Sequence, residues 1–204
     1  EFSPREVQYT CPFCGLDGTL DVLYDMEKLR RKISRNSFRS GPPNLWRYRE
    51  ILPVEKEEHC SPLSAGNTPL YSLPSLASDL GIGNLWIKDD GRNPTASLKD
   101  RASAVGVAKA LDFEQPAVAC ASTGNAASSL AGFAAVAGLP AYIFVPEKAP
   151  AAKVAQLLVY GATVVLVEGN YEAAFHLATE AIEHYGWYKR NCAINPYLVE
   201  GKKT

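Results

Sequence analysis

One lysine of this chain lies where helix electrostatics would make its amine reactive. Ser97 and Asp100 have the spacing of a capping box, so we expect a helix to begin beside them with Lys99 at its second position. The positive end of the helix dipole disfavours an ammonium there and favours the neutral amine. A neutral lysine amine is the group that attacks an aldehyde to form a Schiff base. Lys99 is therefore a candidate catalytic residue, although a surface lysine on an ordinary helix would have the same spacing.

A second turn carries polar side chains between an apolar segment and a predicted helix. Residues 121–126 include Ser122, Thr123, Gly124 and Asn125 at the carboxyl end of a predicted strand, where parallel sheets bind their ligands. N–H groups and hydroxyls at a helix start suit a carboxylate or a phosphate, and a glycine lets the backbone approach the ligand. The asparagine amide can donate to a phenolic oxygen. The alternative is a polar helix cap that needs no ligand.

Both turns need a framework, and the chain becomes regular from residue 84 onward. We expect strands over 85–88, 117–120, 141–145 and 163–167. We expect helices over 98–111, 126–137, 151–160 and 171–185, with a shorter one near 73–80. Short apolar strands that alternate with helices form a parallel sheet covered by helices on both faces. The pattern therefore predicts an α/β fold, with a small α/β domain over about 84–185.

The first 50 residues differ from the rest of the chain. Cys11 and Cys14 form a Cys-x-x-Cys knuckle, and residues 20–24 predict a short strand. The segment has too few clustered apolar residues for a core of its own. We therefore predict an N-terminal knuckle with an irregular arm over 1–50, followed by the main region over 51–204.

Composition and charge exclude several classes of protein. Hydrophobic residues make up 47% of the chain and charged residues 21%, as in ordinary globular proteins. A formal net charge of −1 gives no attraction to nucleic acid or an anionic membrane, and no apolar run approaches the roughly 18 residues of a membrane span. Five cysteines without disulfide-framework spacing suit a reducing cytoplasm. Because the chain starts at Glu1 and residues 200–204 predict the start of another helix, we expect a piece of a longer protein.

Taken together, the two turns resemble the fold-type II pyridoxal-phosphate enzymes, and within them the threonine synthases. Residues 93–101 are similar to the lysine motif of that family, and residues 121–131 are similar to its substrate-contacting loop. Further similarity to the N-terminal portion of the family lies at 66–70, 145–147, 195–197 and 200–204. The resemblance covers nearly the whole chain. It implies a tryptophan synthase β-like fold in which residues 51–204 are the first part of the catalytic region.

The resemblance also implies a cofactor, pyridoxal 5'-phosphate, and roles for individual residues. By this resemblance Lys99 is the Schiff-base residue and then the general base at the substrate Cα, and Asn125 binds the ring hydroxyl of the cofactor. The implied substrate contacts are Ser122, Thr123, Gly124 and Asn125, with Lys88 and Asn93 as weaker candidates near the same site.

The implied reaction converts O-phospho-L-homoserine and water into L-threonine and phosphate, in a homodimer when the protein is complete. Two alternatives stay open: a threonine or serine dehydratase-type β-eliminating enzyme of the same fold, and a non-catalytic threonine-synthase-like binding protein. The expected partner is a small amino-acid substrate, with no nucleic acid and no membrane.

Several positions depart from the pattern of the family. Ala96 and Leu98 stand where the family more often has Gly and Phe. Residues 198–199 are apolar where several relatives place an arginine that binds the substrate phosphate, and either Lys202 or Lys203 is a possible substitute. The glycine-rich loop for the cofactor phosphate comes later in the family's chain. We therefore expect the 204-residue chain alone to bind pyridoxal phosphate weakly and to have no turnover.

The cysteines are expected to have no catalytic role. Threonine synthases of this type often begin with two Cys-x-x-Cys knuckles, and Cys11 and Cys14 resemble the second knuckle alone. Two thiolates cannot complete a tetrahedral zinc site, so we predict no bound metal. Cys120 and Cys192 are predicted to be small apolar fillers.

Overall fold

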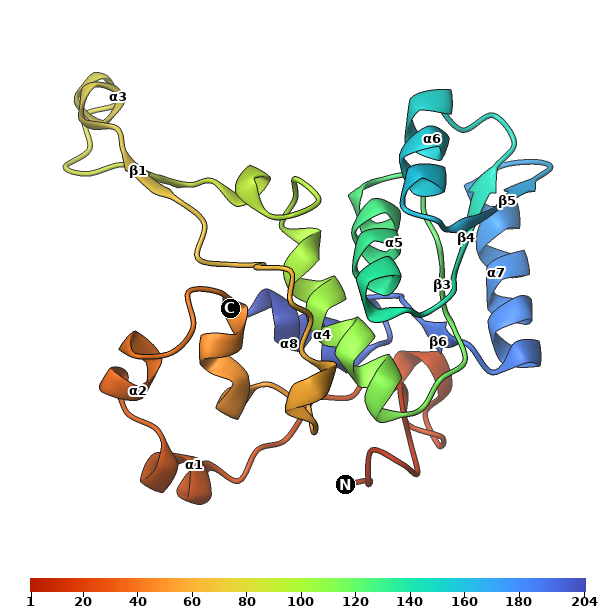
Figure 1. Ribbon diagram of the computed structural model, residues 1–204, viewed down its shortest axis with the longest axis horizontal. Helices are drawn as coiled ribbons and strands as arrows, with labels where there is room; N and C mark the ends of the chain where they lie inside the picture. The colour runs from red at the N-terminus through yellow and green to blue at the C-terminus, as the bar shows by residue number, and fades with distance from the viewer.

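The computed structural model describes residues 1–204, apart from the side chain of Leu16. An α/β body occupies one end of the molecule, and a two-stranded hairpin with a short helix projects at the other (Figure 1). The strands are β1 (Leu70–Ser72), β2 (Trp86–Lys88), β3 (Val118–Ala121), β4 (Ala141–Pro146), β5 (Thr163–Val167) and β6 (Tyr188–Lys189). The α-helices are α1 (Met26–Lys32), α2 (Arg35–Arg39), α3 (Pro74–Asp79), α4 (Lys99–Asp112), α5 (Asn125–Ala137), α6 (Ala151–Val159), α7 (Tyr171–Tyr185) and α8 (Pro196–Lys202).

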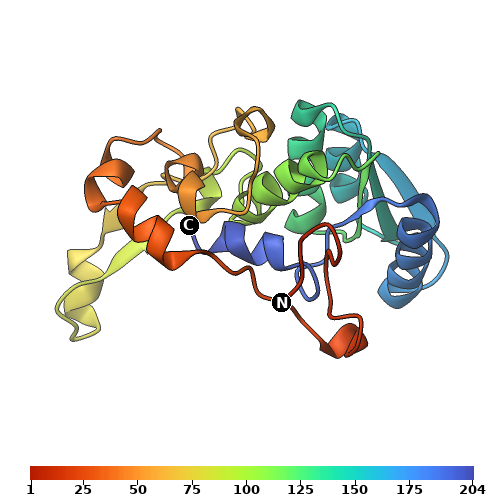
Figure 2. The same cartoon turned by 90° about the horizontal axis from the view of Figure 1, so that it is seen from below.

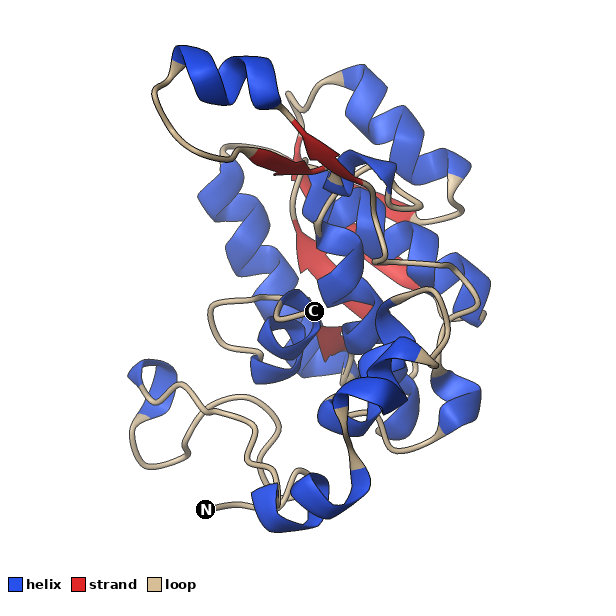
Figure 3. Cartoon of the chain, turned by 90° about the vertical axis from the view of Figure 1, so that its left-hand side faces the viewer, coloured by secondary structure: helices blue, strands red, loops and turns tan.

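A four-stranded sheet in the order β5-β4-β3-β6 forms the centre of the body, and all its paired strands are parallel. Helices α5 and α6 lie on one side of it and α7 on the other (Figure 1). Figure 3 shows the strands, in red, enclosed by helices, in blue. The middle strands are apolar because both of their faces are covered, and Val118, Ile143 and Val145 have no exposed surface. The predicted α/β class, with a parallel sheet between helices, is confirmed.

Close packing of α8 against α4 brings the last helix beneath the body (Figure 2). Gly201 permits this approach, because a Cβ there would lie 2.2 Å from the carbonyl oxygen of Arg101 on α4. Gly106 on α4 faces Leu198 on α8, which is fully buried. The contact therefore fixes α8 relative to the start of α4.

Most predicted elements are confirmed to within two residues, but the membership of the sheet was predicted wrongly. The expected strand at 85–88 is β2, which pairs antiparallel with β1 in the projecting hairpin and takes no part in the parallel sheet. The fourth parallel strand is β6, which the sequence analysis missed. β6 has only two residues, too few to produce an apolar pattern.

Two further expectations about elements were wrong. Residues 20–24 form no strand, because only the isolated bridge between Thr10 and Thr19 pairs backbone in this region. Tyr24 instead donates a hydrogen bond to Glu200, which joins the segment to α8. The helix expected to start at 200–204 begins earlier, at Pro196.

The N-terminal segment contributes to the main core. Leu45 and Trp46 are buried in the same apolar cluster as α4 and α5, and the indole N–H of Trp46 donates to the carbonyl of Ser61. Around Cys11 and Cys14, the described residues contain no group of three His, Cys, Asp or Glu side chains that could hold a metal ion. No helix among the described residues has the length and apolar character of a membrane span.

Candidate active site

A cavity of about 260 Å³ opens at the carboxyl ends of β3 and β6. In sequence order its lining residues are Lys99, Cys120, Ala121, Ser122, Ala126, Tyr171, Phe175, Ala178, Thr179, Ile182, Lys189, Arg190, Asn191, Cys192 and Lys202. They come from the starts of α4 and α5, one face of α7, the end of α8 and the segments after β3 and β6.

The position of the cavity follows from the topology of the sheet. The chain runs from β3 outward to β4 and β5, and then returns to place β6 on the opposite side of β3. The strand order therefore reverses between β3 and β6. Open parallel sheets bind ligands at this switch point, in the crevice outside the carboxyl ends of the strands.

The cavity is strongly basic. Four of its lining side chains are cationic, namely Lys99, Lys189, Arg190 and Lys202, and none of its lining residues is an aspartate or a glutamate. In the described part of the chain, no ion pair joins these four groups to an acid. Burial lowers the pKa of Lys189, and the nearby carboxylate of Glu183 opposes that shift, so the charge of Lys189 is partly balanced. The other clustered cations favour an anionic ligand.

Lys99 is the first residue of α4, which places its backbone at the positive end of the helix dipole. The predicted capping box is not formed. Asp100 accepts hydrogen bonds from the backbone N–H and the hydroxyl of Thr95, and the Ser97 hydroxyl accepts from the Lys99 N–H at 3.2 Å. The loop doubles back at Ala96, whose φ is +60°, and this brings Thr95 rather than Ser97 to the carboxylate.

A second set of contacts holds the loop before α4. Arg101 binds Asp90, and the side chain of Asn93 accepts a hydrogen bond from the N–H of Gly66 at 2.8 Å. Asn93 is buried and Lys88 donates to the carbonyl of Thr68. Neither of these two weaker candidates lines the cavity, so their observed contacts are structural.

The turn between β3 and α5 reaches the cavity at both of its ends. Ser122 and Ala126 line the cavity, whereas Thr123, Gly124 and Asn125 lie between them without contributing to its wall. The N–H of Gly124 donates to the Ser122 hydroxyl, and no side chain caps α5. The first N–H groups of α5 therefore have no side-chain partner, contrary to the alternative of a polar helix cap.

The two lysines considered as substitutes for a phosphate-binding arginine lie in different places. Lys202 lines the cavity. Lys203 instead pairs with Glu200 and lies over the ring of Tyr24. Of the apolar residues at 198–199, Leu198 is fully buried between α8 and α4, whereas Val199 is half exposed.

The segment after β6 supplies cavity residues that the sequence analysis did not identify as functional. Arg190 is only 6% exposed, and its Nε and Nη2 atoms are buried without a hydrogen-bond partner. Cys192, predicted to be a small apolar filler, lies in the same wall and is half-buried. Cys120 is buried as expected, and burial raises the pKa of its thiol to about 11. In the sequence, two adjacent cations at 189 and 190 come directly before Asn191 and Cys192, and this polar run was the signal that could have indicated a site here.

Comparison with known proteins identifies relatives of the whole chain. A family model described as pyridoxal-phosphate dependent enzyme matches residues 62–204. The threonine synthase of Methanosarcina acetivorans is 43% identical over 100% of this chain and 49% of its own length. The threonine synthase of Methanocaldococcus jannaschii is 40% identical over 98% of this chain and 48% of its own length.

A solved structure supports the same assignment. The structure of maize serine racemase is similar with a TM-score of 0.60 and 28% identity, over 66% of this chain and 41% of that chain. The chain spans about half the length of the curated relatives it matches. The resemblance to threonine synthases and the fold-type II class are both confirmed, and the cofactor of these enzymes is pyridoxal phosphate. The chain belongs to the pyridoxal-phosphate dependent enzyme family.

Proposed function

We propose that this chain carries the Schiff-base lysine and part of the substrate site of a threonine synthase. The reaction would convert O-phospho-L-homoserine and water into L-threonine and phosphate. The observation that carries the proposal is the position of Lys99, at the first residue of α4 and inside a cavity with four cations and no carboxylate. Both the cofactor and the proposed substrate carry a phosphate, which such a cavity favours.

The residues of the cavity fit the cofactor. Lys99 supplies an amine that no acid neutralises, and the unpaired donors of Arg190 leave positive charge for an anion. When bound, pyridoxal phosphate supplies an electron sink for negative charge at the substrate Cα. Lys99 would hold the cofactor covalently, and Asn125 would donate to its ring hydroxyl.

The remaining residues would orient the substrate and control its proton. The amine of Lys99 would act as the general base that takes the proton from the substrate Cα. Ser122, Thr123 and the N–H groups after Gly124 would bind the substrate carboxylate at the start of α5. The apolar wall of α7, which includes Phe175, would exclude water from the reacting atoms.

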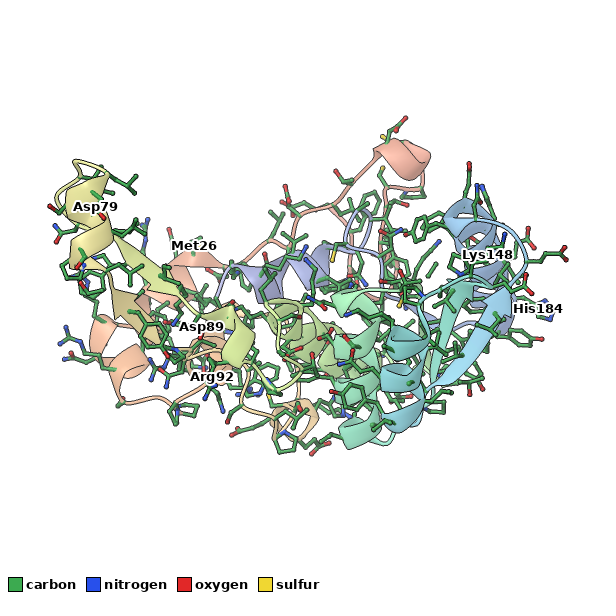
Figure 4. All side chains as sticks on the ribbon, turned by 90° about the horizontal axis from the view of Figure 1, so that it is seen from above. Met26, Asp79, Asp89, Arg92, Lys148 and His184 are labelled. Carbon is green, nitrogen blue, oxygen red and sulfur yellow. The ribbon has the colours of Figure 1, made fainter. Side chains whose placement is uncertain are left out.

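Covalent trapping tests the proposal without turnover. The chain is mixed with pyridoxal phosphate and reduced with borohydride, and the labelled peptide is identified by mass spectrometry. We expect the label on Lys99, and loss of that label in Lys99→Ala. Lys148→Ala is the control, because Lys148 is exposed, lies at the outer edge of the molecule in Figure 4 and does not line the cavity. A label spread over surface lysines, unchanged in Lys99→Ala, would contradict the proposal.

A dehydratase-type enzyme is the second candidate. It is favoured by the apolar residues at 198–199, where the resemblance leads us to expect an arginine that binds the substrate phosphate. Product analysis of the longer protein with O-phosphohomoserine and with threonine separates the two activities. Binding of both without any product would instead favour the non-catalytic binding protein.

We also propose that the 204-residue chain alone binds the cofactor weakly and has no turnover.

Three broader expectations stay proposals. The boundary between 1–50 and 51–204 is one, and limited proteolysis tests it. A cytoplasmic location is supported by the five described cysteines, which are all free thiols. A homodimer of the complete protein is supported by the exposed apolar side chains of the hairpin, such as Tyr71 and Trp86, and light scattering tests it.

A further inference from the structure

Arg190 is a buried cation that the structure leaves without a partner. It follows β6 directly, and its backbone N–H donates to the carbonyl of Ala119 on β3 at 2.9 Å, which fixes its position at the switch point of the sheet. Only 6% of the residue is exposed, and both Nε and Nη2 lack an acceptor. A buried guanidinium without counter-charge or acceptor is strongly unfavourable.

The unpaired atoms form one edge of the guanidinium group. Nε and Nη2 are two parallel donors, a geometry that matches two oxygens of a carboxylate or a phosphate. Arg101 shows this use of the same edge within the chain, because its Nε and Nη2 donate to the two carboxylate oxygens of Asp90 at 2.8 and 2.9 Å. No acidic side chain lines the cavity to do the same for Arg190. The acceptor for Arg190 is therefore expected to come from a ligand.

The charge around Arg190 indicates which ligand. Lys202 lines the same cavity and forms no ion pair with an acid, so Arg190 and Lys202 together carry more positive charge than one carboxylate would balance. A phosphate monoester carries close to two negative charges at neutral pH and presents three acceptor oxygens. We propose that Arg190, assisted by Lys202, binds a phosphate monoester in this cavity. This phosphate could belong to the cofactor or to the substrate, and both of these compounds come from the proposed function, on which the inference therefore rests.

The inference would also explain the apolar residue at position 198. The resemblance leads us to expect an arginine for the substrate phosphate at 198–199, whereas these residues are apolar and Leu198 is buried against Gly106. Arg190 approaches the cavity from β6 rather than from α8. If the ligand is the substrate, Arg190 would be a specificity-determining residue that replaces the missing arginine from a different element.

Binding of phosphate compounds tests the inference by calorimetry on the 204-residue chain. Inorganic phosphate is the first probe. Pyridoxal phosphate against pyridoxal, and O-phosphohomoserine against homoserine, then distinguish the two sources. The variants are Arg190→Met, which keeps an aliphatic chain, and Arg190→Lys, which keeps the charge and loses the fork. Arg31→Met is the control, because the Arg31 side chain is 84% exposed on α1.

Both Arg190 variants should bind inorganic phosphate about 10- to 100-fold more weakly, as expected for losing charge-assisted hydrogen bonds. The control should bind as the parent chain does. The compound whose phosphate is recognised should lose affinity in the variants, whereas its phosphate-free partner should not. Unchanged phosphate binding in both Arg190 variants would overturn the inference.

The melting temperature distinguishes a ligand-binding role of Arg190 from a purely structural one, because the two roles predict opposite changes in the variant without ligand. Without ligand, Arg190→Met should melt at a higher temperature than the parent chain, because an unpaired buried cation is removed. Phosphate should raise the melting temperature of the parent but not of this variant. A variant that melts lower and is still stabilised by phosphate would refute the inference. If Arg190→Met does not fold, the same comparison is made with Arg190→Lys. Failure of the trapping on Lys99 with retained, Arg190-dependent phosphate binding would refute the proposed function alone.

Discussion

Arg101 and Asp90 form a two-pronged ion pair that anchors the start of α4. The Nε and Nη2 atoms of Arg101 donate to Oδ2 and Oδ1 of Asp90 at 2.8 and 2.9 Å, and the hydroxyl of Thr68 donates to Oδ1 at 2.6 Å. Arg101 lies on the same helical turn as Lys99. The pair therefore ties the start of α4, with the candidate Schiff-base lysine, to the segment after β2, and Thr68 extends the link to the segment before β1.

The ion pair predicts a specific loss of stability in acid. The hydrogen bonds from Arg101 hold the pKa of Asp90 at about 2, below its usual value of 3.8. Because the folded-state pKa is depressed, the stabilisation is present above about pH 4 and is lost as the pH falls through about 2. The difference corresponds to about 2 kcal/mol at most, since Asp90 retains some contact with water. Urea unfolding of the parent and of Asp90→Asn at several pH values should give a difference in the free energy of unfolding that narrows toward pH 2. A difference that does not depend on pH would contradict this account.

Ala96 is strained, and replacing it by glycine should stabilise the chain. Its φ of +60° is a left-handed conformation that disfavours a Cβ. We expect Ala96→Gly to raise the free energy of unfolding by about 0.5–1 kcal/mol, the steric relief less the extra entropy of an unfolded glycine. Ala155→Gly, at an exposed position within α6, is the matched control and should lower it by about 1 kcal/mol. The prediction fails if both substitutions destabilise the chain equally.

The fold was predictable where apolar patterns are long. The strands β3, β4 and β5 have runs of apolar residues between helices, and their limits were placed to within one residue. β6 was missed because Tyr188 and Lys189 give no pattern, and its position depends on pairing with β3. The apolar run at 85–88 formed a strand but joined β1, since local sequence does not specify which partner a strand pairs with.

The candidate site was predictable in part for the same reason. Lys99 is the first residue of α4 and Ser122 is the residue after β3, and the sequence predicts both of these elements. Their places in one cavity were therefore predictable. Arg190 and Cys192 enter that cavity only because β6 returns beside β3, which no local pattern indicated. The capping box was wrong because Asp100 has two possible backbone donors nearby, and the turn at Ala96 selects Thr95.

Two glycines at the interface of α4 and α8 should respond differently to alanine. At Gly201 the new Cβ would lie 2.2 Å from the backbone oxygen of Arg101, which cannot move without shifting α4. At Gly106 it would meet the Cδ2 of Leu198 at 2.4 Å, the end of a side chain that can rotate. We expect Gly201→Ala to cost more than about 3 kcal/mol and Gly106→Ala about 1–3 kcal/mol.

Chemical denaturation measures both effects, and a double variant separates them. Leu198→Ala should partly rescue Gly106→Ala, because it removes the atom that clashes. It should not rescue Gly201→Ala. Equal rescue of both would show that the side chain of Leu198, rather than the backbone of α4, limits the approach of α8.

Asp112 at the end of α4 should be the most sensitive acidic residue of the chain. Burial opposes its ionisation, but the N–H of Glu55, the ring of His59 and the ammonium of Lys109 outweigh burial and lower its pKa. The side chain of Asp112 is fully buried and that of Lys109 is 2% exposed, so Asp112→Asn leaves a buried cation with Glu55 as its remaining partner. We expect a loss of about 3–5 kcal/mol in the free energy of unfolding, measured by urea denaturation at neutral pH.

The control is Glu58→Gln, which should cost less than about 1 kcal/mol, because Glu58 is exposed and lies 4.0 Å from His59. Since the depressed pKa stabilises the folded chain only while Asp112 is ionised, the difference between the parent and Asp112→Asn should shrink in acid, and a difference that grows in acid would contradict the assignment.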